Sequence, residues 1–250
     1  MMIRNIKKRP TATLVMIALV FVGIALGNWQ LKRAAQKEQI AQELIEKEKV
    51  YPLVANEKMW HLAEALHHKM SAKGIFLESE AIWLENRPHP LGQDPHTGIA
   101  TGFFLMMPFR LSGESGVVIW VNRGWVPRNF QNLNEVPPVI TPKKEVEIHG
   151  LVFEGPSKTY QMGADLNSKA SDGLALQENL NLELEGQRHQ WEQLPFILRE
   201  DDLDIQDGLQ RTWAPMDHGA EKNFGYAFQW FALSLMSFVF WLVSGFRSKP

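Results

Sequence analysis

The chain has 250 residues, a formal net charge of −2 at pH 7 and no cysteine. A chain so close to neutrality carries no basic field that would attract nucleic acid, so we do not expect nucleic-acid binding. Without cysteine there are no disulfides, no thiol redox chemistry and no thiolate ligands for copper or iron–sulfur clusters.

Two uncharged apolar stretches lie near the ends of the sequence. The first runs from Thr11 to Leu31 and the second from Phe224 to Phe246, and neither contains Asp, Glu, Lys, Arg or His. A helix of either length can cross a hydrocarbon core about 30 Å thick. The sequence therefore predicts a membrane protein whose extramembrane domain lies between two spans. The expected division is a cytoplasmic tail at 1–10, a transmembrane helix at 11–31, an extracytoplasmic β-rich domain that begins with an amphipathic helix at 32–223, a second transmembrane helix at 224–246 and a cytoplasmic tail at 247–250.

Basic residues flank both spans and predict their orientation. Four of them lie within residues 4–9, and Arg247 and Lys249 follow the second span. Because Lys and Arg near membrane ends favour the cytoplasmic or matrix side, both termini are expected inside and the central domain outside, although the basic residues at 32–37 oppose this. The short tail lacks the long Arg- and Ser-rich presequence of mitochondrial import. We therefore expect a multi-pass protein of a bacterial inner membrane, with a periplasmic domain.

A cleaved signal peptide is the alternative interpretation of the first stretch, with Ala25-Leu26-Gly27 as its cleavage site. The helical pattern, however, passes Trp29 without a turn signal and continues among Lys and Glu as far as Ile45. Tryptophan is typical of the membrane–water interface, and Arg33 and Lys37 can extend to lipid headgroups. We therefore expect an uncleaved anchor in the lipid bilayer that continues as a surface helix.

The central domain shows mainly β signals after a linker and a short amphipathic piece at 50–68. Links too short for helical crossovers favour antiparallel pairing, and the polar segment 165–190, with its alternating leucines, is expected to be a hairpin or a loop. The predicted fold is a membrane-anchored α+β protein, in which N- and C-terminal transmembrane helices flank a mainly antiparallel β barrel- or sandwich-like domain. The expected strands are Gly74–Leu77, Ala81–Leu84, Gly102–Leu111, Val117–Val121, Glu145–Phe153 and Gln193–Leu198.

Two Asn-Arg pairs are the most specific local feature of the domain. Asn122-Arg123-Gly124-Trp125 follows a predicted strand, and we expect a turn there because Gly124 permits a positive φ and the Pro127 that follows cannot continue a central strand. Asn86-Arg87 ends another predicted strand in the same way. The two pairs can share a neighbouring acidic group, grip a propionate or a phospholipid headgroup, or serve as buried guanidinium anchors that tie loops.

No catalytic or metal-binding pattern stands out. His61, Glu64, His67 and His68 lie within two helical turns but lack the i, i+4 histidine spacing of a zinc helix, so a solvated face is expected. The sequence shows no Ser/His/Asp elbow, no phosphate-binding Gly loop and no paired-carboxylate motif. We therefore expect no enzymatic activity and no metal site.

Several strings in the chain, taken together and in order, resemble the Surfeit locus protein family. That family consists of assembly factors for haem–copper cytochrome oxidase. The resemblance implies a role in maturing oxidase subunit I through delivery or insertion of haem a, with subunit I and other assembly factors as partners. The strings are Gly27-Asn28-Trp29-Gln30-Leu31-Lys32-Arg33, Glu85-Asn86-Arg87, Asn122-Arg123-Gly124-Trp125-Val126-Pro127 and Tyr226-Ala227-Phe228-Gln229-Trp230-Phe231.

One position departs from the family pattern. Many members have a histidine, proposed as a haem ligand, where this chain has Asn223, and asparagine is a poor axial ligand for haem iron. The resemblance then leaves His218 as the candidate ligand for a transiently bound haem a, with Tyr226 or Trp230 packing on the macrocycle. Two functions follow: a haem-carrying assembly factor, or a non-haem membrane scaffold that stabilises immature subunit I.

Overall fold

The computed structural model describes residues 9–113, 116–132, 135–158, 168–169, 173–203, 206–213 and 219–247. The chain divides into two compact units. Met1–Ile45 and Met216–Pro250 belong to a helical unit, and Glu46–Pro215 forms a globular unit.

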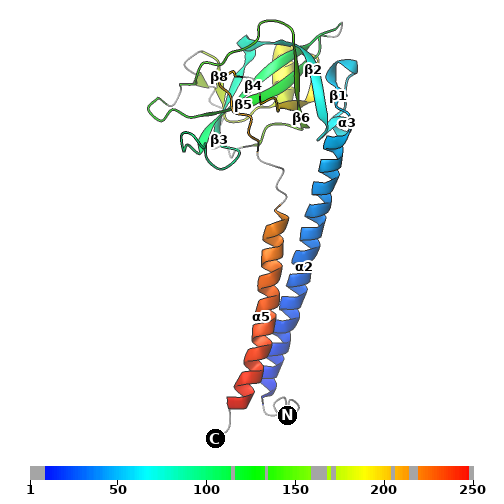
Figure 1. Ribbon diagram of the computed structural model, residues 1–250, viewed down its shortest axis with the longest axis vertical. Coiled ribbons are helices and arrows are strands. Elements are labelled where there is room, and N and C mark those ends of the chain that lie inside the picture. The colour runs from blue at the N-terminus through cyan, green and yellow to red at the C-terminus, as the bar shows by residue number, and fades with distance from the viewer. Residues whose placement is uncertain are drawn as a thin grey trace. The chain divides into compact units, whose positions relative to one another are not determined.

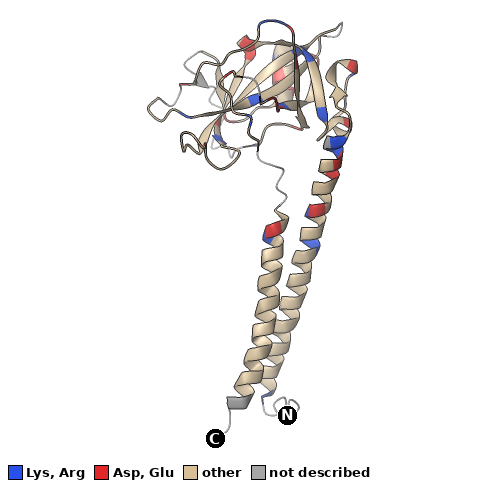
Figure 2. Cartoon of the chain, in the orientation of Figure 1, with Lys and Arg blue, Asp and Glu red and all other residues tan. Residues whose placement is uncertain are grey.

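The helical unit contains two long helices, α2 (Pro10–Lys49) and α5 (Ala220–Arg247), which lie side by side and antiparallel (Figure 1). Both are long and apolar enough to cross a membrane. At 1.5 Å per residue, the 40 residues of α2 extend roughly 60 Å, which exceeds the thickness of a hydrocarbon core. Charged residues on the two helices gather toward the end of α2 and the start of α5 (Figure 2). The predicted continuation of the first span as a surface helix is thus present as one unbroken element.

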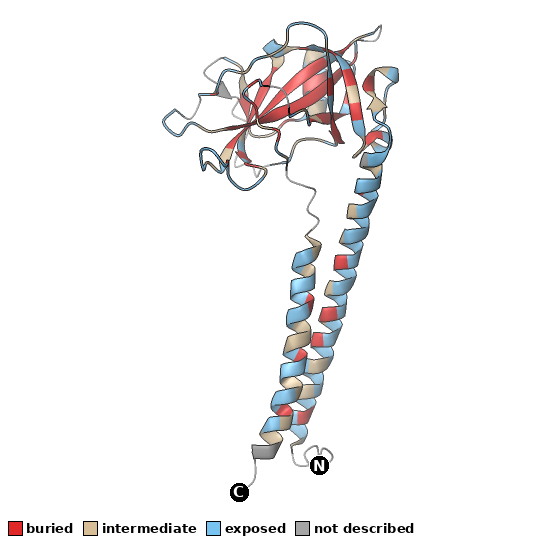
Figure 3. Cartoon of the chain, viewed as in Figure 1, coloured by how far each residue is buried: buried red, intermediate tan, exposed pale blue. Residues whose placement is uncertain are grey.

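The two helices pack through a seam whose buried and half-buried positions recur every three or four residues (Figure 3). On α5, the buried residues Ala227, Ser234 and Trp241 are seven residues apart. On α2, Gly23 lies so close to Ser234 that a Cβ atom there would come within 2.0 Å of the Ser234 hydroxyl oxygen. Glycine permits this close approach of two helix backbones, which is how helices associate where water supplies no driving force.

The globular unit has a mixed sheet whose described strands are all hydrogen-bonded into one sheet. Its helices are short: the 3₁₀ turns η1 (Ala55–Glu57) and η2 (Glu78–Glu80), and the α-helices α3 (Leu62–Ala65) and α4 (Leu182–His189). The strands are β1 (Leu53–Val54), β2 (Lys69–Phe76), β3 (Ile82–Pro88), β4 (Thr101–Leu111), β5 (Val118–Pro127), β6 (Val146–Phe153), β7 (Ser168–Lys169), β8 (Ala175–Gln177) and β9 (Gln193–Glu200).

Strands β2, β6, β9, β5 and β4 close into a barrel, because β2 pairs with both β6 and β4. Most pairs are antiparallel, which confirms the predicted fold class. The parallel pairs β1–β2, β3–β8 and β5–β9 differ from the antiparallel expectation. In the pairs β3–β8 and β5–β9, other strands lie between the two partners in the chain, whereas β1 and β2 are consecutive strands joined by η1 and α3.

The apolar core follows the two-residue period of the strands. On β4, Phe103, Leu105, Met107 and Phe109 point into the main core, whereas Phe104 and Met106 point to a second cluster on the other face. Because both faces of β4 are covered, its side chains from Gly102 to Phe109 are all buried. Strand β4 is therefore packed on both faces, and its neighbours β3 and β5 carry the two Asn-Arg pairs.

The segment expected to be a hairpin or a loop contains a helix that the sequence reading missed. Strands β7 and β8 pair antiparallel, but α4 follows them at Leu182–His189. Its N-cap is Asn181, whose side-chain oxygen accepts a hydrogen bond from the backbone N–H of Leu184 at 3.2 Å. The alternating leucines obscured this capping signal, because their period of two is typical of a strand.

Candidate functional site

Both Asn-Arg pairs lie at β-bulges on the strands that flank β4. Leu105 and Met106 of β4 face Gly124 and Asn122, so Arg123 is the extra residue of β5. The pairing of β3 with β4 shifts between Leu84 and Arg87. The predicted turn after Asn122 is therefore wrong: β5 continues through Gly124 (φ 147°) to Pro127, and the bulge absorbs the irregularity. A bulge redirects side chains out of the alternating pattern. In β5 the extra residue is Arg123, and in β3 the irregularity lies at Glu85-Asn86, directly before Arg87.

The bulge directs Arg123 into a buried network of four charges, which we call the barrel clamp: Arg123, Glu200, Asp207 and Arg211. Arg123 Nη2 donates to Asp207 Oδ2 at 2.7 Å, and Arg211 donates to Asp207 Oδ1 at 3.0 Å and to Glu200 Oε2 at 3.1 Å. The four side chains are at most 2% exposed. Two positive and two negative charges balance, which is the condition for burying them together.

Burial and pairing act against each other within the barrel clamp. Burial lowers the pKa of Arg123 and raises the pKa of Glu200, although in each case the opposite charges nearby oppose the shift. At Arg211 burial also opposes the charge, but the hydrogen bond to Asp207 and the two carboxylates outweigh it and raise the pKa. Arginine keeps its proton in proteins, so both guanidinium groups carry their charge near neutral pH.

The rest of the motif holds the backbone of residues 206–213, which we call the exit segment because the chain continues from it to α5. Trp125 and Gln210 exchange two backbone hydrogen bonds, of 2.8 and 2.9 Å. A Cβ atom at Gly124 would lie 2.8 Å from Leu209 Cβ, so only glycine permits this approach. At the end of the exit segment, the Trp213 indole N–H donates to Glu200 O at 2.7 Å. The motif thus fixes the part of the chain that precedes the second span.

Arg87 ties loops in a different part of the barrel. Its guanidinium is buried and donates to the backbone carbonyl oxygens of Ser157 and Glu178. Burial lowers its pKa to about 10, so it stays protonated at neutral pH. Asn86 occupies the left-handed region (φ 56°) and accepts a hydrogen bond from Arg128 at 2.9 Å. Arg87 and Arg123 therefore contact different groups and share no carboxylate among the described residues.

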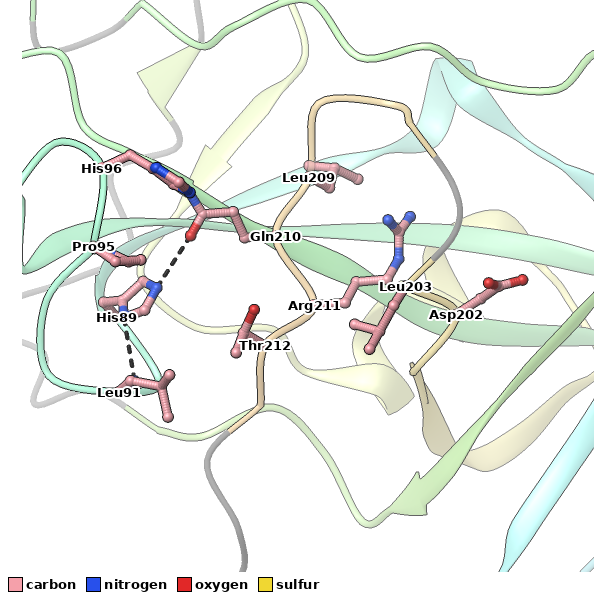
Figure 4. A pocket seen from close by; sticks show the side chains of 10 residues that line it. All are labelled: His89, Leu91, Pro95, His96, Asp202, Leu203, Leu209, Gln210, Arg211 and Thr212. Atoms are coloured by element: carbon pink, nitrogen blue, oxygen red, sulfur yellow. Dashed lines mark hydrogen bonds between the residues drawn. The ribbon is translucent and has the colours of Figure 1, made fainter.

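A small polar cavity of about 210 Å³ lies between the 89–96 loop and the exit segment (Figure 4). His89 Nδ1 accepts from the backbone N–H of Leu91 at 3.2 Å, so its proton is on Nε2, which lies 3.1 Å from Gln210 Oε1. Both ring nitrogens are thus engaged, and the imidazole packs edge-on against Trp125 at 4.7 Å. In the described parts of the chain, no group of three or more His, Asp or Glu is placed to hold a metal ion.

A second polar cluster lies in the helical unit, and we call its three residues, Gln30, Lys37 and Asn223, the helix latch. Asn223 Nδ2 donates to Gln30 Oε1 at 2.6 Å, and Lys37 Nζ donates to Asn223 Oδ1 at 2.8 Å. Lys37 also donates to the backbone oxygen of Gly219 at 3.3 Å. These contacts join α2 to the start of α5. Gln30 belongs to one of the strings singled out in the sequence, and Asn223 lies three residues before another.

The other candidate residues of the two spans do not belong to the helix latch. Trp29 and Tyr226 are more than half exposed, and Arg33 donates to Gln36 of its own helix at 3.4 Å. Trp230 is half-buried, and its backbone oxygen accepts from Ser234 at 3.0 Å. His218, the candidate haem ligand, lies outside the described residues.

The described residues at the latch do not fit an axial haem ligand. Asn223 uses both its amide nitrogen and its amide oxygen within the latch, and an amide is not among the side chains that ligate haem iron. Tyr226 is the nearest residue on α5 with a side chain that can ligate haem, and it follows Asn223 by three positions. At the position where many family members have a histidine, this chain has Asn223, whose side chain contacts the neighbouring helix α2.

The sequence reading missed the partners of Arg123. Glu200 lies two residues beyond the predicted strand Gln193–Leu198, and Asp207 and Arg211 lie in a polar stretch that resembles an ordinary loop. Two features of the sequence hint at the network. Asp207 and Arg211 have the i, i+4 spacing of an ion pair, and Arg123 precedes Gly124 in a predicted strand end. Neither signal identifies its partner without the fold.

Comparisons with known proteins agree with the layout. A "SURF1-like protein" from Drosophila melanogaster is 29% identical over 141 residues, which cover 53% of this chain and 46% of that protein. A "SURF1-like protein" from Monosiga brevicollis is 28% identical over 152 residues, or 58% of this chain and 55% of that protein. The chain thus spans about half the length of the curated relatives it matches. The model of the SURF1 family matches residues 16–235, a range that includes most of α2, the whole barrel and the first part of α5, and the chain belongs to the SURF1 family.

Proposed function

We propose that this protein is a membrane-anchored, non-enzymatic assembly factor for haem–copper cytochrome oxidase, and that it holds immature subunit I during maturation. Membership of the SURF1 family supports the oxidase role. The observation that carries the holding role is the use of the family motif: Arg123, Gly124 and Trp125 are buried and fasten the exit segment. These contacts stabilise residues 206–213, the part of the barrel domain that comes before α5 in the chain.

Delivery of haem a is the second candidate function. When bound, the group would be inserted into subunit I as its redox cofactor. His218 is the remaining candidate ligand near the second span, and the exposed aromatic residues Tyr226 and Phe228 offer a surface for an apolar macrocycle. The engagement of Asn223 in the helix latch favours the holding role over haem ligation at that position.

The membrane and the orientation are also proposals. The basic flanks support an arrangement with both termini on the cytoplasmic side and the barrel outside. A bacterial inner membrane remains a prediction from the sequence, and both similar proteins named above come from eukaryotes. A reporter that is active only in the cytoplasm should be active when it is fused after Pro250. If that fusion is inactive, and a reporter that works only outside the cytoplasm is active at the same position, the orientation is contradicted.

The oxidase role can be tested with tagged full-length protein in cells that make haem a and lack their own copy. We expect the protein to restore the oxidase absorbance of the membranes and to co-purify with subunit I. Unchanged oxidase content in cells without the protein would refute the role. The spectrum of the purified protein separates the two candidate functions, because stoichiometric haem that is lost in His218→Ala establishes haem carriage, whereas a haem-free preparation that retains subunit I establishes holding.

A further inference from the structure

The helix latch is a polar cluster in a seam that is otherwise lined mainly by apolar and small residues. Ala34, which lies between Gln30 and Lys37 on α2, is fully buried, as is Ala227, one turn after Asn223 on α5. The three polar residues occupy the same seam spacing as these alanines, and all three are partly buried. Polar side chains in such positions are costly unless they pair across the two helices. The contacts described above show that they do pair.

Lys37 needs a hydrogen-bond acceptor near the start of α5, and Asn223 supplies one. A lysine near the start of α5 faces the positive end of the helix dipole, which disfavours it. Two oxygen atoms compensate: Asn223 Oδ1 at 2.8 Å and the backbone oxygen of Gly219 at 3.3 Å. The amide of Asn223 then uses its other end, Nδ2, to donate to Gln30, which lies seven residues before Lys37 on α2. One side chain thus accepts from one residue of α2 and donates to another.

We infer that Asn223 is a coupling residue that, with Gln30 and Lys37, fixes the register of α2 against α5, and that this position does not coordinate haem iron in this chain. A donor and an acceptor on one short side chain, engaged with two α2 residues seven positions apart, allow only one longitudinal register. The middle of the seam is held by the close approach of Gly23 to Ser234, and its far end by the bond from the Trp241 indole to Thr13 at 3.1 Å. The latch is the contact that holds the end where the chain enters α5. The inference depends on the helix pair alone and not on the oxidase role.

The absence of cysteine from the sequence allows a direct test with one engineered pair. Ser234 Oγ lies 3.4 Å from Val20 O on the facing helix, so Val20→Cys with Ser234→Cys places two thiols across the seam and reports the helix register without adding a side chain at Gly23. In full-length protein in membranes, we expect Asn223→Ala to slow oxidation of this pair about three- to tenfold, the effect of one lost interhelical hydrogen-bonded group.

Three variants separate coupling from a general disturbance. Lys37→Met should slow the oxidation to a similar extent, and the double variant should be no slower than either single variant, because the residues act as one unit. Tyr226→Leu, on the exposed side of the same turn, should leave the rate unchanged. Equal rates for wild type and Asn223→Ala, or multiplied effects in the double variant, would overturn the coupling role.

The haem part of the inference has its own readout. Protein purified from cells that make haem a should contain the same amount of haem, whatever that amount is, in the wild type and in Asn223→Ala. Loss of a haem absorbance band in Asn223→Ala alone would overturn the inference. Oxidase maturation is not needed for either measurement, so a failure of the proposed function leaves the test of the latch intact.

Discussion

The barrel clamp and the helix latch hold the two ends of the same connection, but they do so with different chemistry. The clamp joins four full charges whose side chains are at most 2% exposed, and it precedes α5 in the chain. The latch joins two neutral amides and one lysine that are only partly buried, at the start of α5.

This difference has an energetic consequence. Removing one charge from a buried network leaves its partners unpaired in a medium that solvates them poorly, so the loss is large. Removing an amide from a partly exposed helix seam costs less, because water or lipid headgroups can replace its partner. We therefore expect the clamp to control the stability of the barrel and the latch to control the register of the helices.

The largest expected effect comes from Arg123→Met. The substitution leaves two carboxylates with a single guanidinium, and we expect the free energy of unfolding of the globular unit to fall by about 3–5 kcal/mol. Urea unfolding of the full-length protein in detergent, followed by tryptophan fluorescence, measures it. Arg110→Met, on the exposed edge of β4, is the matched control and should change stability by less than about 0.5 kcal/mol. Similar values for the two variants would remove the energetic distinction between the clamp and a surface arginine.

Gly124→Ala tests the close approach of the β5 backbone to the exit segment. The new Cβ atom would lie 2.8 Å from Leu209 Cβ and 2.9 Å from Gln210 O, at a φ of 147°. We expect a loss of about 2–4 kcal/mol, from backbone strain and from displacement of the exit segment. Gly98→Ala also adds a Cβ atom at a positive φ (70°), but it has no atom within 4 Å, so only the strain of about 1–2 kcal/mol remains. Hydrogen exchange at Gln210 should rise in Gly124→Ala and stay unchanged in Gly98→Ala.

Gly23→Leu disturbs the helix seam without touching the barrel. Because a Cβ atom at Gly23 falls 2.0 Å from the Ser234 hydroxyl oxygen, the helices must separate. Spin labels on cysteines introduced at the exposed positions Leu14 and Val243 should then give a broader and longer distance distribution. Gly225→Leu, where the Cβ atom meets nothing within 4 Å, should leave the distribution as it is. An unfolding midpoint of the barrel that falls only in Gly23→Leu would show that the two regions are not energetically separate.

The smallest expected effect is a pH dependence near the exit segment. Burial raises the pKa of Asp94, but hydrogen bonds from Thr97, His96 and Gln210 outweigh it, and the net pKa lies below its usual 3.8. Asp94 therefore contributes stability above pH 3.8, and this contribution is lost as the pH falls through the lowered folded-state pKa. Asp94→Asn should remove this part of the acid dependence. An identical acid limb in wild type and variant would contradict the shift.

The sequence was sufficient for the features that depend on periodicity. Both long helices, the barrel strands and the family resemblance follow from apolar runs and from motif order. The closure of the barrel through the β2–β4 pair and the parallel β5–β9 pair depend on contacts between distant residues, which no local pattern encodes. The bulge at Arg123 was read as a turn because Gly124 and Pro127 are turn residues; only the register with β4 identifies it. The partners of Arg123 and Asn223 lie 84 and 193 positions away, so their roles required the fold.

A double-mutant cycle between Arg123 and Asp207 tests the central claim most directly, namely that the family motif serves to hold the exit segment. The unfolding free energies of Arg123→Met, Asp207→Asn and the double variant would be measured in the full-length protein, together with the hydrogen exchange of the exit segment. We predict a coupling energy of about 2–3 kcal/mol, with faster exchange at Gln210 in all three variants. Additive effects within about 0.5 kcal/mol, with exchange at Gln210 unchanged, would contradict the account.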